Sequence, residues 1–210
     1  YVTDYIQYLA EQVSHHPPVT ACYCRGKKYS YHTCQKTNTK FSGKTLYFYQ
    51  QYRVYVDLDE FGERYEIQLP PFSAHNLIFG TMYIDIGDTM TVTNLSRPNE
   101  QCTIKFERRS WMGKEMCKLT GEAFIGGAGK PEIFYEIQGN WNGAIQLKDT
   151  KKGTAQPVWS KKPYPPMWDH MYGMSRFSLQ LNYFPKRLHN VVPPTDTRRR
   201  PDQRALEEGD

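Results

Sequence analysis

Two adjacent histidines, His15 and His16, stand between Ser14 and the proline pair Pro17-Pro18. Two imidazolium rings and a hydroxyl group can donate charge-assisted hydrogen bonds to one phosphate group. A phosphate nearby also favours the charged form of an imidazole. These residue types are compatible with a site that binds a phosphate, although composition alone favours a pair of surface histidines beside a loop.

The prolines restrict the backbone that carries the histidines. Proline fixes φ and biases the residue before it toward extended geometry, so residues 16–18 cannot lie inside a helix. Neighbouring side chains on an extended segment point to opposite faces. Both imidazoles can therefore meet one ligand only if the backbone departs from a regular strand.

Two pairs of soft metal ligands follow the histidines: Cys22 with Cys24, then His32 with Cys34. Residues two apart on a strand share a face, and residues 25–31 could close a hairpin, so the four side chains could approach a zinc ion. Zinc ligands are more often separated by about two to four residues. Buried thiols on a strand are therefore the preferred interpretation, and we predict no metal site.

Adjacent histidines could also act as general acid and base. No Gly-x-Ser-x-Gly sequence, phosphate-cradling glycine loop or paired-carboxylate pattern accompanies them. The clustered acids Asp57, Asp59 and Glu60 are typical of a solvated turn. We therefore predict that the chain is not an enzyme and needs no cofactor.

The chain is mildly basic, with a net charge of +5 and clusters at Arg198-Arg199-Arg200 and Lys151-Lys152. No nucleic-acid recognition motif accompanies these clusters, so we predict no nucleic-acid partner. A solvated face or contact with anionic lipid is the preferred role for these charges.

The length of 210 residues, with 39% hydrophobic and 14% aromatic residues, indicates a single globular domain or one large piece of one. No run of about 18 apolar residues predicts a transmembrane helix. Five cysteines, an odd number in a chain long enough to fold without disulfides, indicate free thiols in a reducing compartment.

Short alternating segments divided by glycine-rich turns indicate a mainly β fold, an antiparallel sheet that closes or nearly closes. Residues 1–10 are expected to form a short helix or an irregular lead-in, residues 175–183 a last strand, and residues 201–208 a helix with proline at its first position. The other expected strands are residues 19–24, 29–35, 45–56, 64–69, 77–86, 89–94, 101–107, 116–125, 132–138 and 143–148.

Several blocks of sequence occur together in one order. They are Glu11-Gln12-Val13-Ser14-His15-His16-Pro17-Pro18, Trp141-Asn142 after Gly139, Met171-Tyr172-Gly173-Met174-Ser175, and Pro193-Pro194-Thr195-Asp196-Thr197-Arg198 running into residues 200–210. With these blocks the chain resembles the lipid-binding domain of the oxysterol-binding protein family over most of its length.

The resemblance implies a large antiparallel, near-closed β-barrel around a lipid tunnel, with a minor C-terminal helix. Residues 1–210 would be part of that domain, with barrel strands over about 19–183 and a C-terminal extension over 184–210. The family's N-terminal lid segment and C-terminal end are expected to lie outside this sequence.

The resemblance also implies a function. His15 and His16 match the family's phosphate-binding pair, with Ser14 beside them, so phosphatidylinositol 4-phosphate is the expected headgroup ligand. Sterol, or alternatively phosphatidylserine, is the expected exchanged lipid, and an anionic membrane surface the expected partner. The implied location is cytoplasmic, peripheral at organelle membranes. A zinc-stabilised binding module is the more distant alternative.

Overall fold

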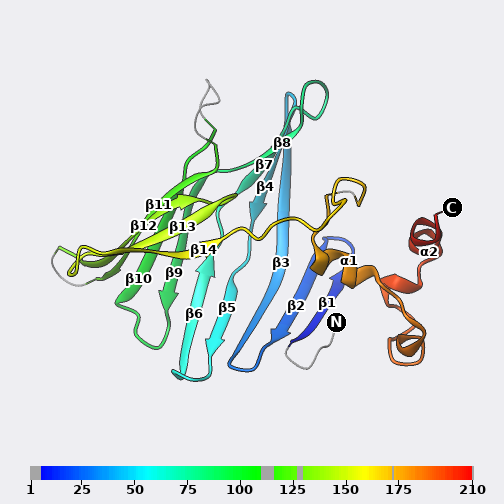
Figure 1. Ribbon diagram of the computed structural model, residues 1–210, viewed down its shortest axis with the longest axis horizontal. Coiled ribbons are helices and arrows are strands. Elements are labelled where there is room, and N and C mark those ends of the chain that lie inside the picture. The colour runs from blue at the N-terminus through cyan, green and yellow to red at the C-terminus, as the bar shows by residue number, and fades with distance from the viewer. Residues whose placement is uncertain (1–5, 110–115, 127–129, 172, 210) are drawn as a thin grey trace. The chain divides into compact units, whose positions relative to one another are not determined.

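The computed structural model describes residues 6–109, 116–126, 130–171 and 173–209 (Figure 1). They belong to two compact units, Tyr1–Lys161 and Lys162–Asp210. The described part of the first unit consists of strands: β1 Gln7–Ser14, β2 Val19–Arg25, β3 Tyr29–Ser42, β4 Thr45–Gln50, β5 Val54–Leu58, β6 Glu63–Gln68, β7 Phe72–His75, β8 Tyr83–Ile86, β9 Asp88–Asn94, β10 Glu100–Phe106, β11 Lys118–Ile125, β12 Glu132–Asn140, β13 Ala144–Asp149 and β14 Ala155–Ser160.

The strands form one antiparallel sheet that branches at β3 (Figure 1). The main sheet runs in the order β14-β13-β12-β11-β10-β9-β6-β5-β3-β2-β1, and the branch runs β3-β4-β7-β8. The first part of β3 pairs with β5 and its last part pairs with β4. Within the described residues β1 and β14 have one neighbour each, so the sheet is not closed. The predicted mainly β, antiparallel architecture is confirmed, and the open sheet is consistent with a near-closed barrel.

The cross-strand register gives the main sheet one apolar face. Residues directly opposite each other in an antiparallel ladder share a face. One such row crosses β1, β2, β3, β5, β6, β9 and β10. In that order of strands it consists of Ala10, Cys22, Thr33, Val54, Ile67, Val92 and Cys102. On the same face, Ile104 lies opposite Gly121, which lies opposite Ile137 and then Leu147. The other face carries threonine, glutamate, glutamine and lysine side chains.

Few side chains on the apolar face of the main sheet are fully buried. Leu119 is 2% exposed and Cys24 is the other buried apolar residue among the described positions. Asn94, 1% exposed, is satisfied by hydrogen bonds: its Nδ2 donates to Glu100, and its Oδ1 accepts from the backbone of Ser96 and Arg97. A single sheet layer with one apolar face leaves most of that face only half-buried.

The second unit is helical where it is regular. It contains α1 Arg176–Asn182, the 3₁₀ turns η1 Lys186–Leu188 and η2 Thr197–Arg199, and α2 Pro201–Glu208. Pro201 begins α2 and Gly209, at φ 86°, ends it in the left-handed conformation, so the predicted C-terminal helix is confirmed.

The prediction of a last strand over residues 175–183 is wrong, because this segment is α1. Ser175 caps that helix by accepting a hydrogen bond from the Ser178 amide at 3.3 Å. Alternating Phe177, Leu179 and Leu181 suggested a strand, but a short apolar run does not distinguish strand from helix. The strands consequently run from Gln7 to Ser160 rather than over about 19–183.

Three other expectations need correction. Residues 7–10 belong to strand β1, which is held by pairing with β2, while residues 1–5 lie outside the described residues. The expected strand 45–56 is two strands, β4 and β5, which join different parts of the branched sheet. Of the expected strand 77–86 only β8 is extended, because Asn76 and Gly80 take positive φ values of 60° and 88°. Strands β7 and β14 were not predicted.

The enclosed position of Leu119 leads to a stability prediction. Leu119→Ala should lower the free energy of unfolding by about 2–5 kcal/mol, because it opens a cavity in a packed site. Leu9, 67% exposed on β1, is the matched control, and Leu9→Ala should cost less than about 0.5 kcal/mol. Urea denaturation of both variants measures the difference; equal losses would contradict the placement of Leu119.

In the second unit Arg198 donates two hydrogen bonds to Asp196, at 2.8 and 2.6 Å, and both side chains are largely buried. The guanidinium group holds the pKa of Asp196 below its usual value. A carboxylate with a lowered pKa stabilises the fold above its unfolded pKa of about 3.9, and this stabilisation is lost as the pH falls through the lower folded pKa.

Asp196→Asn should therefore destabilise the protein by about 1–3 kcal/mol at pH 7, with a difference from the native protein that disappears in strong acid. Asp202→Asn removes a similar pair, with Arg200, that is about two-thirds exposed. Its effect at pH 7 should be clearly smaller because solvent screens the pair. Thermal denaturation between pH 2 and pH 7 tests this, and a pH-independent cost at Asp196 would contradict it.

Candidate functional site

His15 and His16 lie in the turn between β1 and β2. The register of that strand pair shifts between Gln12 and Ser14, and the bond between His16 and Pro17 is cis. The two imidazole ring centroids are 4.3 Å apart, with the ring planes tilted by 47°. The two rings therefore lie side by side at an irregular turn instead of pointing to opposite faces, which is the arrangement that one shared ligand requires.

The histidine pair is open to solvent. Both imidazoles are exposed, and Ser14, opposite Val19 at the end of the ladder, is half-buried. A phosphate presents several acceptor oxygens, so two neighbouring imidazolium rings can donate to the same group. The turn can therefore receive an anion from solvent or from a membrane surface without any rearrangement of the strands.

The apolar face begins on the strands that carry this turn, and its ionisable groups are held neutral. The Tyr8 hydroxyl lies 3.8 Å from the Cys22 sulfur, and burial together with this contact raises the pKa of Tyr8 to about 12. Burial raises the pKa of the Cys102 thiol to about 11 and also raises that of Cys24. Thiols and phenols with such pKa values carry no charge at neutral pH, so this face suits an apolar ligand.

The four-ligand zinc arrangement is contradicted by the register. Cys22 lies opposite Thr33, so Cys22 and Cys24 share a face with Thr33. His32 and Cys34 flank Thr33 along β3 and point to the other face. The two ligand pairs are therefore separated by the sheet, and the zinc-stabilised module is excluded in the form in which it was considered.

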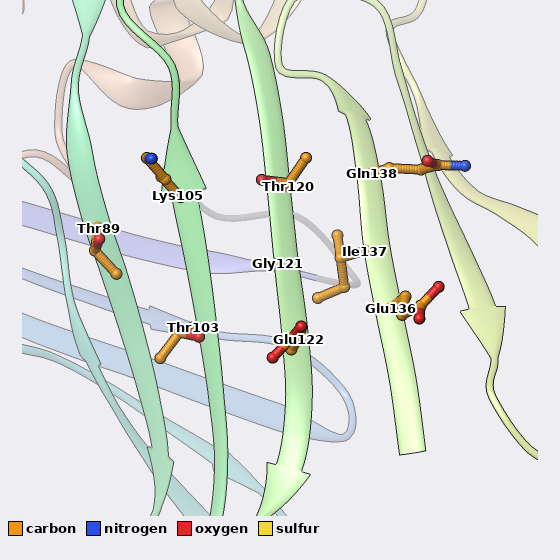
Figure 2. Close-up of a pocket in the computed structure, with 9 residues that line it drawn as sticks. All are labelled: Thr89, Thr103, Lys105, Thr120, Gly121, Glu122, Glu136, Ile137 and Gln138. Atoms are coloured by element: carbon orange, nitrogen blue, oxygen red, sulfur yellow. The ribbon is translucent and has the colours of Figure 1, made fainter. Parts of the chain in front are cut away.

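A polar hollow of about 400 Å³ lies across β9, β10, β11 and β12 (Figure 2). Two cross-strand rows line it, Thr89-Lys105-Thr120-Gln138 and Thr103-Glu122-Glu136. These side chains lie on the face opposite to the apolar one. Hydroxyl, amide and charged groups do not favour an acyl chain or a sterol ring system. The alternation of Thr103 and Lys105 was visible in the sequence, but no local pattern indicates a hollow that four strands create together.

The acidic turn contains no paired carboxylates free for acid–base chemistry. Arg64 donates to Asp57 at 2.6 Å and lowers the pKa of that carboxyl group. Asp59 pairs with Arg25 at 2.7 Å, and Glu60 pairs with Lys28 at 2.8 Å. The interpretation of this cluster as a surface turn agrees with these ion pairs.

The basic clusters are engaged within the protein. Besides the Arg198 pair with Asp196, Arg199 donates to the Pro193 and Val192 carbonyls and Arg200 pairs with Asp202. Lys151 pairs with Glu132 at 2.9 Å, and Lys152 lies 3.8 Å from Asp149. These clusters therefore take part in ion pairs and hydrogen bonds with neighbouring residues.

The site therefore consists of an apolar sheet face and, at the end of two of its strands, an exposed turn with two neighbouring imidazoles. The sequence model of the oxysterol-binding protein family matches residues 2–210. The chain belongs to the oxysterol-binding protein family.

The similar proteins agree with this membership. Oxysterol-binding protein-related protein 3 of Mus musculus and oxysterol-binding protein-related protein 7 of Homo sapiens are each 30% identical over 203 residues, covering 97% of this chain and 23% and 24% of those proteins. The chain therefore spans about a quarter of these relatives.

Solved structures share the fold. The Osh1 ORD domain in complex with cholesterol is 25% identical, with a TM-score of 0.85 over 100% of this chain and 53% of that one. The Osh3 ORD from Saccharomyces cerevisiae, in complex with PI(4)P, is 23% identical, with a TM-score of 0.82 over 97% of this chain and 53% of that one. The chain thus corresponds to about half of each solved domain.

Among the described residues no helix is long and apolar enough to cross a membrane.

The two faces of the sheet predict different thiol reactivities. Cys34 is exposed on the polar face, whereas burial raises the pKa of Cys102 to about 11. A disulfide reagent such as Ellman's reagent at pH 8 should therefore modify Cys34 rapidly, and Cys34→Ser should remove that fast phase. Cys102→Ser should leave the fast phase unchanged. Equally fast modification of Cys102 would contradict its burial on the apolar face.

Proposed function

We propose that this chain is part of a lipid-transfer domain that binds phosphatidylinositol 4-phosphate and sterol and exchanges them between membranes. The observation that carries the proposal is the exposed pair of neighbouring imidazoles, His15 and His16, with Ser14 beside them at the end of strands that carry an apolar face. The headgroup phosphate is assigned to these three residues, and the apolar part of the lipid to the apolar face.

Binding energetics explain why the headgroup and the apolar tail have different roles in lipid selection. Burial of a lipid tail contributes about 25 cal/mol per Å² of apolar surface removed from water, but the bilayer offers the same gain. Discrimination among lipids must therefore come from polar contacts with the headgroup. Charge-assisted hydrogen bonds from the histidine pair supply such contacts for a phosphomonoester.

Sterol is proposed as the second lipid because the Osh1 ORD domain has been solved with cholesterol and with ergosterol, at 25% and 26% identity to this chain. Phosphatidylserine is the alternative cargo of the same family. The five cysteines are free, which supports a reducing compartment. We accordingly place the domain in the cytoplasm, peripherally at organelle membranes.

The test of the headgroup site is extraction of phosphatidylinositol 4-phosphate from liposomes. His15→Ala and His16→Ala should each weaken binding by about 1.5–3 kcal/mol, or roughly 10- to 150-fold, because each removes a charge-assisted hydrogen bond. The double variant should extract none detectably. The exposed His170, which lies in the second unit, is the control, and His170→Ala should extract like the native protein.

Binding of a fluorescent sterol separates the two ligands. The double histidine variant should keep sterol binding, since the histidines serve the phosphate and not the apolar face. Undiminished extraction of phosphatidylinositol 4-phosphate by the double variant would disprove the assignment. Competition by phosphatidylserine but not by cholesterol would favour the alternative cargo.

A further inference from the structure

Two hairpin turns lie side by side at the end of β3, where the branch β3-β4-β7-β8 projects beyond the main sheet (Figure 1). One is the β3–β4 turn around Gly43, and the other is the loop of residues 76–82 between β7 and β8. The Leu77 amide donates to the Lys44 carbonyl at 3.0 Å, which fastens the loop to the turn.

Large apolar side chains are concentrated on these turns, and they are between 39 and 67% exposed. On the branch, Phe41, Leu46, Ala74 and Ile84 form one cross-strand row, whose two ends, Phe41 and Ile84, are exposed. We call the six exposed apolar residues of these turns and of the adjoining strand ends the tip patch: Phe41, Leu77, Ile78, Phe79, Met82 and Ile84.

The opposite face of the branch carries three buried polar side chains. Thr45, Ser73 and Asp85 are 8%, 3% and 6% exposed. The two ring nitrogens of His75 lie 2.9 Å from the Ser73 hydroxyl and 3.2 Å from the Thr45 hydroxyl. Buried polar side chains on one face, together with exposed apolar residues at both ends of the row on the other, are the reverse of what an ordinary surface hairpin shows. Such an arrangement suits an apolar environment.

The loop that carries the tip patch is held in one shape. The Asn76 side chain donates to the Thr81 carbonyl at 2.9 Å, and Asn76 and Gly80 take the positive φ values that the turn needs. Insertion of an ordered loop costs less conformational entropy than insertion of a flexible one.

Charge indicates which apolar environment the tip patch meets. Residues 36–50 and 69–84 contain three lysines, Lys36, Lys40 and Lys44, and no aspartate or glutamate. The one acidic residue on the strands of the branch, Asp85 on β8, is only 6% exposed and accepts a hydrogen bond from the Arg109 amide. Neither Lys40 nor Lys44 has an acidic partner among the described residues, and the Lys44 ammonium lies 4.8 Å from the centre of the Phe79 ring. Apolar side chains bordered by lysines match the interface of an anionic bilayer.

We infer that the tip patch is the surface by which this domain docks on a membrane. Ile78, Phe79 and Met82 enter the interfacial region of an anionic leaflet while Lys40 and Lys44 contact its headgroups. The inference rests on the proposed function, since a lipid carrier must meet a bilayer, but it concerns residues that the headgroup site does not use.

The test measures flotation of the protein with vesicles of phosphatidylcholine and phosphatidylserine. Phe79→Glu should weaken vesicle binding on the order of tenfold or more, because it removes a large apolar contact and adds a negative charge. Phe61 is the matched control: it has the same side chain and is 68% exposed, against 66% for Phe79, but it lies on the β5–β6 turn at the far end of the sheet. Phe61→Glu should bind like the native protein.

The lysines have a separate readout. Lys40→Glu with Lys44→Glu should weaken binding by about fivefold per lysine on phosphatidylserine vesicles, and should have no effect on neutral vesicles or at 1 M salt. Lys28→Glu, at the far end of β3, is the control. An identical loss on neutral vesicles would mean that the lysines do not contact headgroups.

Insertion itself can be observed with Phe79→Trp, whose emission should shift to the blue and be quenched by brominated acyl chains. Phe61→Trp should show neither change. Native vesicle binding by Phe79→Glu, or absence of quenching at position 79, would overturn the proposal. In that case the tip patch would bind a protein instead of a membrane. If Phe79→Glu then abolished a concentration-dependent dimer, that protein would be a second copy of this chain.

The two proposals can fail separately. The double variant His15→Ala/His16→Ala should still float with phosphatidylserine vesicles that contain no phosphoinositide. Phe79→Glu should still bind a soluble short-chain phosphatidylinositol 4-phosphate. Loss of flotation in the histidine variant would place docking at the histidine turn and contradict the tip patch.

Discussion

The cross-strand register of the main sheet is the constraint on which the rest of the structure depends. Side chains alternate along each strand, so a slip of one residue would exchange the apolar and polar faces. The ladder leaves no room for such a slip at two glycines: a Cβ atom at Gly121 would lie 2.5 Å from the Thr103 carbonyl oxygen, and one at Gly139 would lie 2.3 Å from that of Ala144. Close approach of neighbouring strands at these points fixes which residues face each other, and therefore which face is apolar.

The turn that carries His15 and His16 depends on the same ladder. Strands β1 and β2 remain in register as far as Gln12, and the shift that follows frees the backbone at Ser14 to bring His15 and His16 side by side. A regular continuation of β1 would have sent the imidazoles to opposite faces. The sheet thus supplies an apolar surface and, where its pairing becomes irregular, a polar site beside it, which are the two halves that an amphipathic lipid needs.

The sequence predicted the parts of this arrangement that local patterns encode. Alternating residues such as Cys102, Ile104 and Phe106 identified β10 and its neighbours, and Pro201 identified the start of α2. Strands β1 and β14 were not predicted, because they form by pairing with a neighbouring strand and not through a pattern of their own. β1 carries little apolar alternation, and β14 is paired only with β13. The tip loop was expected as strand because its apolar residues continue into β8, whereas Asn76 and Gly80 turn the chain there. The histidine pair was recognisable from its residue types, but the meeting of its rings depends on a register shift that no short segment specifies.

The charge distribution along β3 connects the two proposed surfaces. At the strand's beginning, basic groups are neutralised by ion pairs, Arg25 with Asp59 and Lys28 with Glu60. At its end the lysines have no acids near them in the sequence. Val19, just after the histidine turn, lies opposite Lys36, which is about 20 Å along the strand from the tip at Ser42. The headgroup site and the tip patch therefore lie toward the same end of the sheet. A domain docked by the tip patch would therefore have its proposed phosphate-binding turn at the membrane-facing end of the sheet, about 20 Å along β3 from the tip.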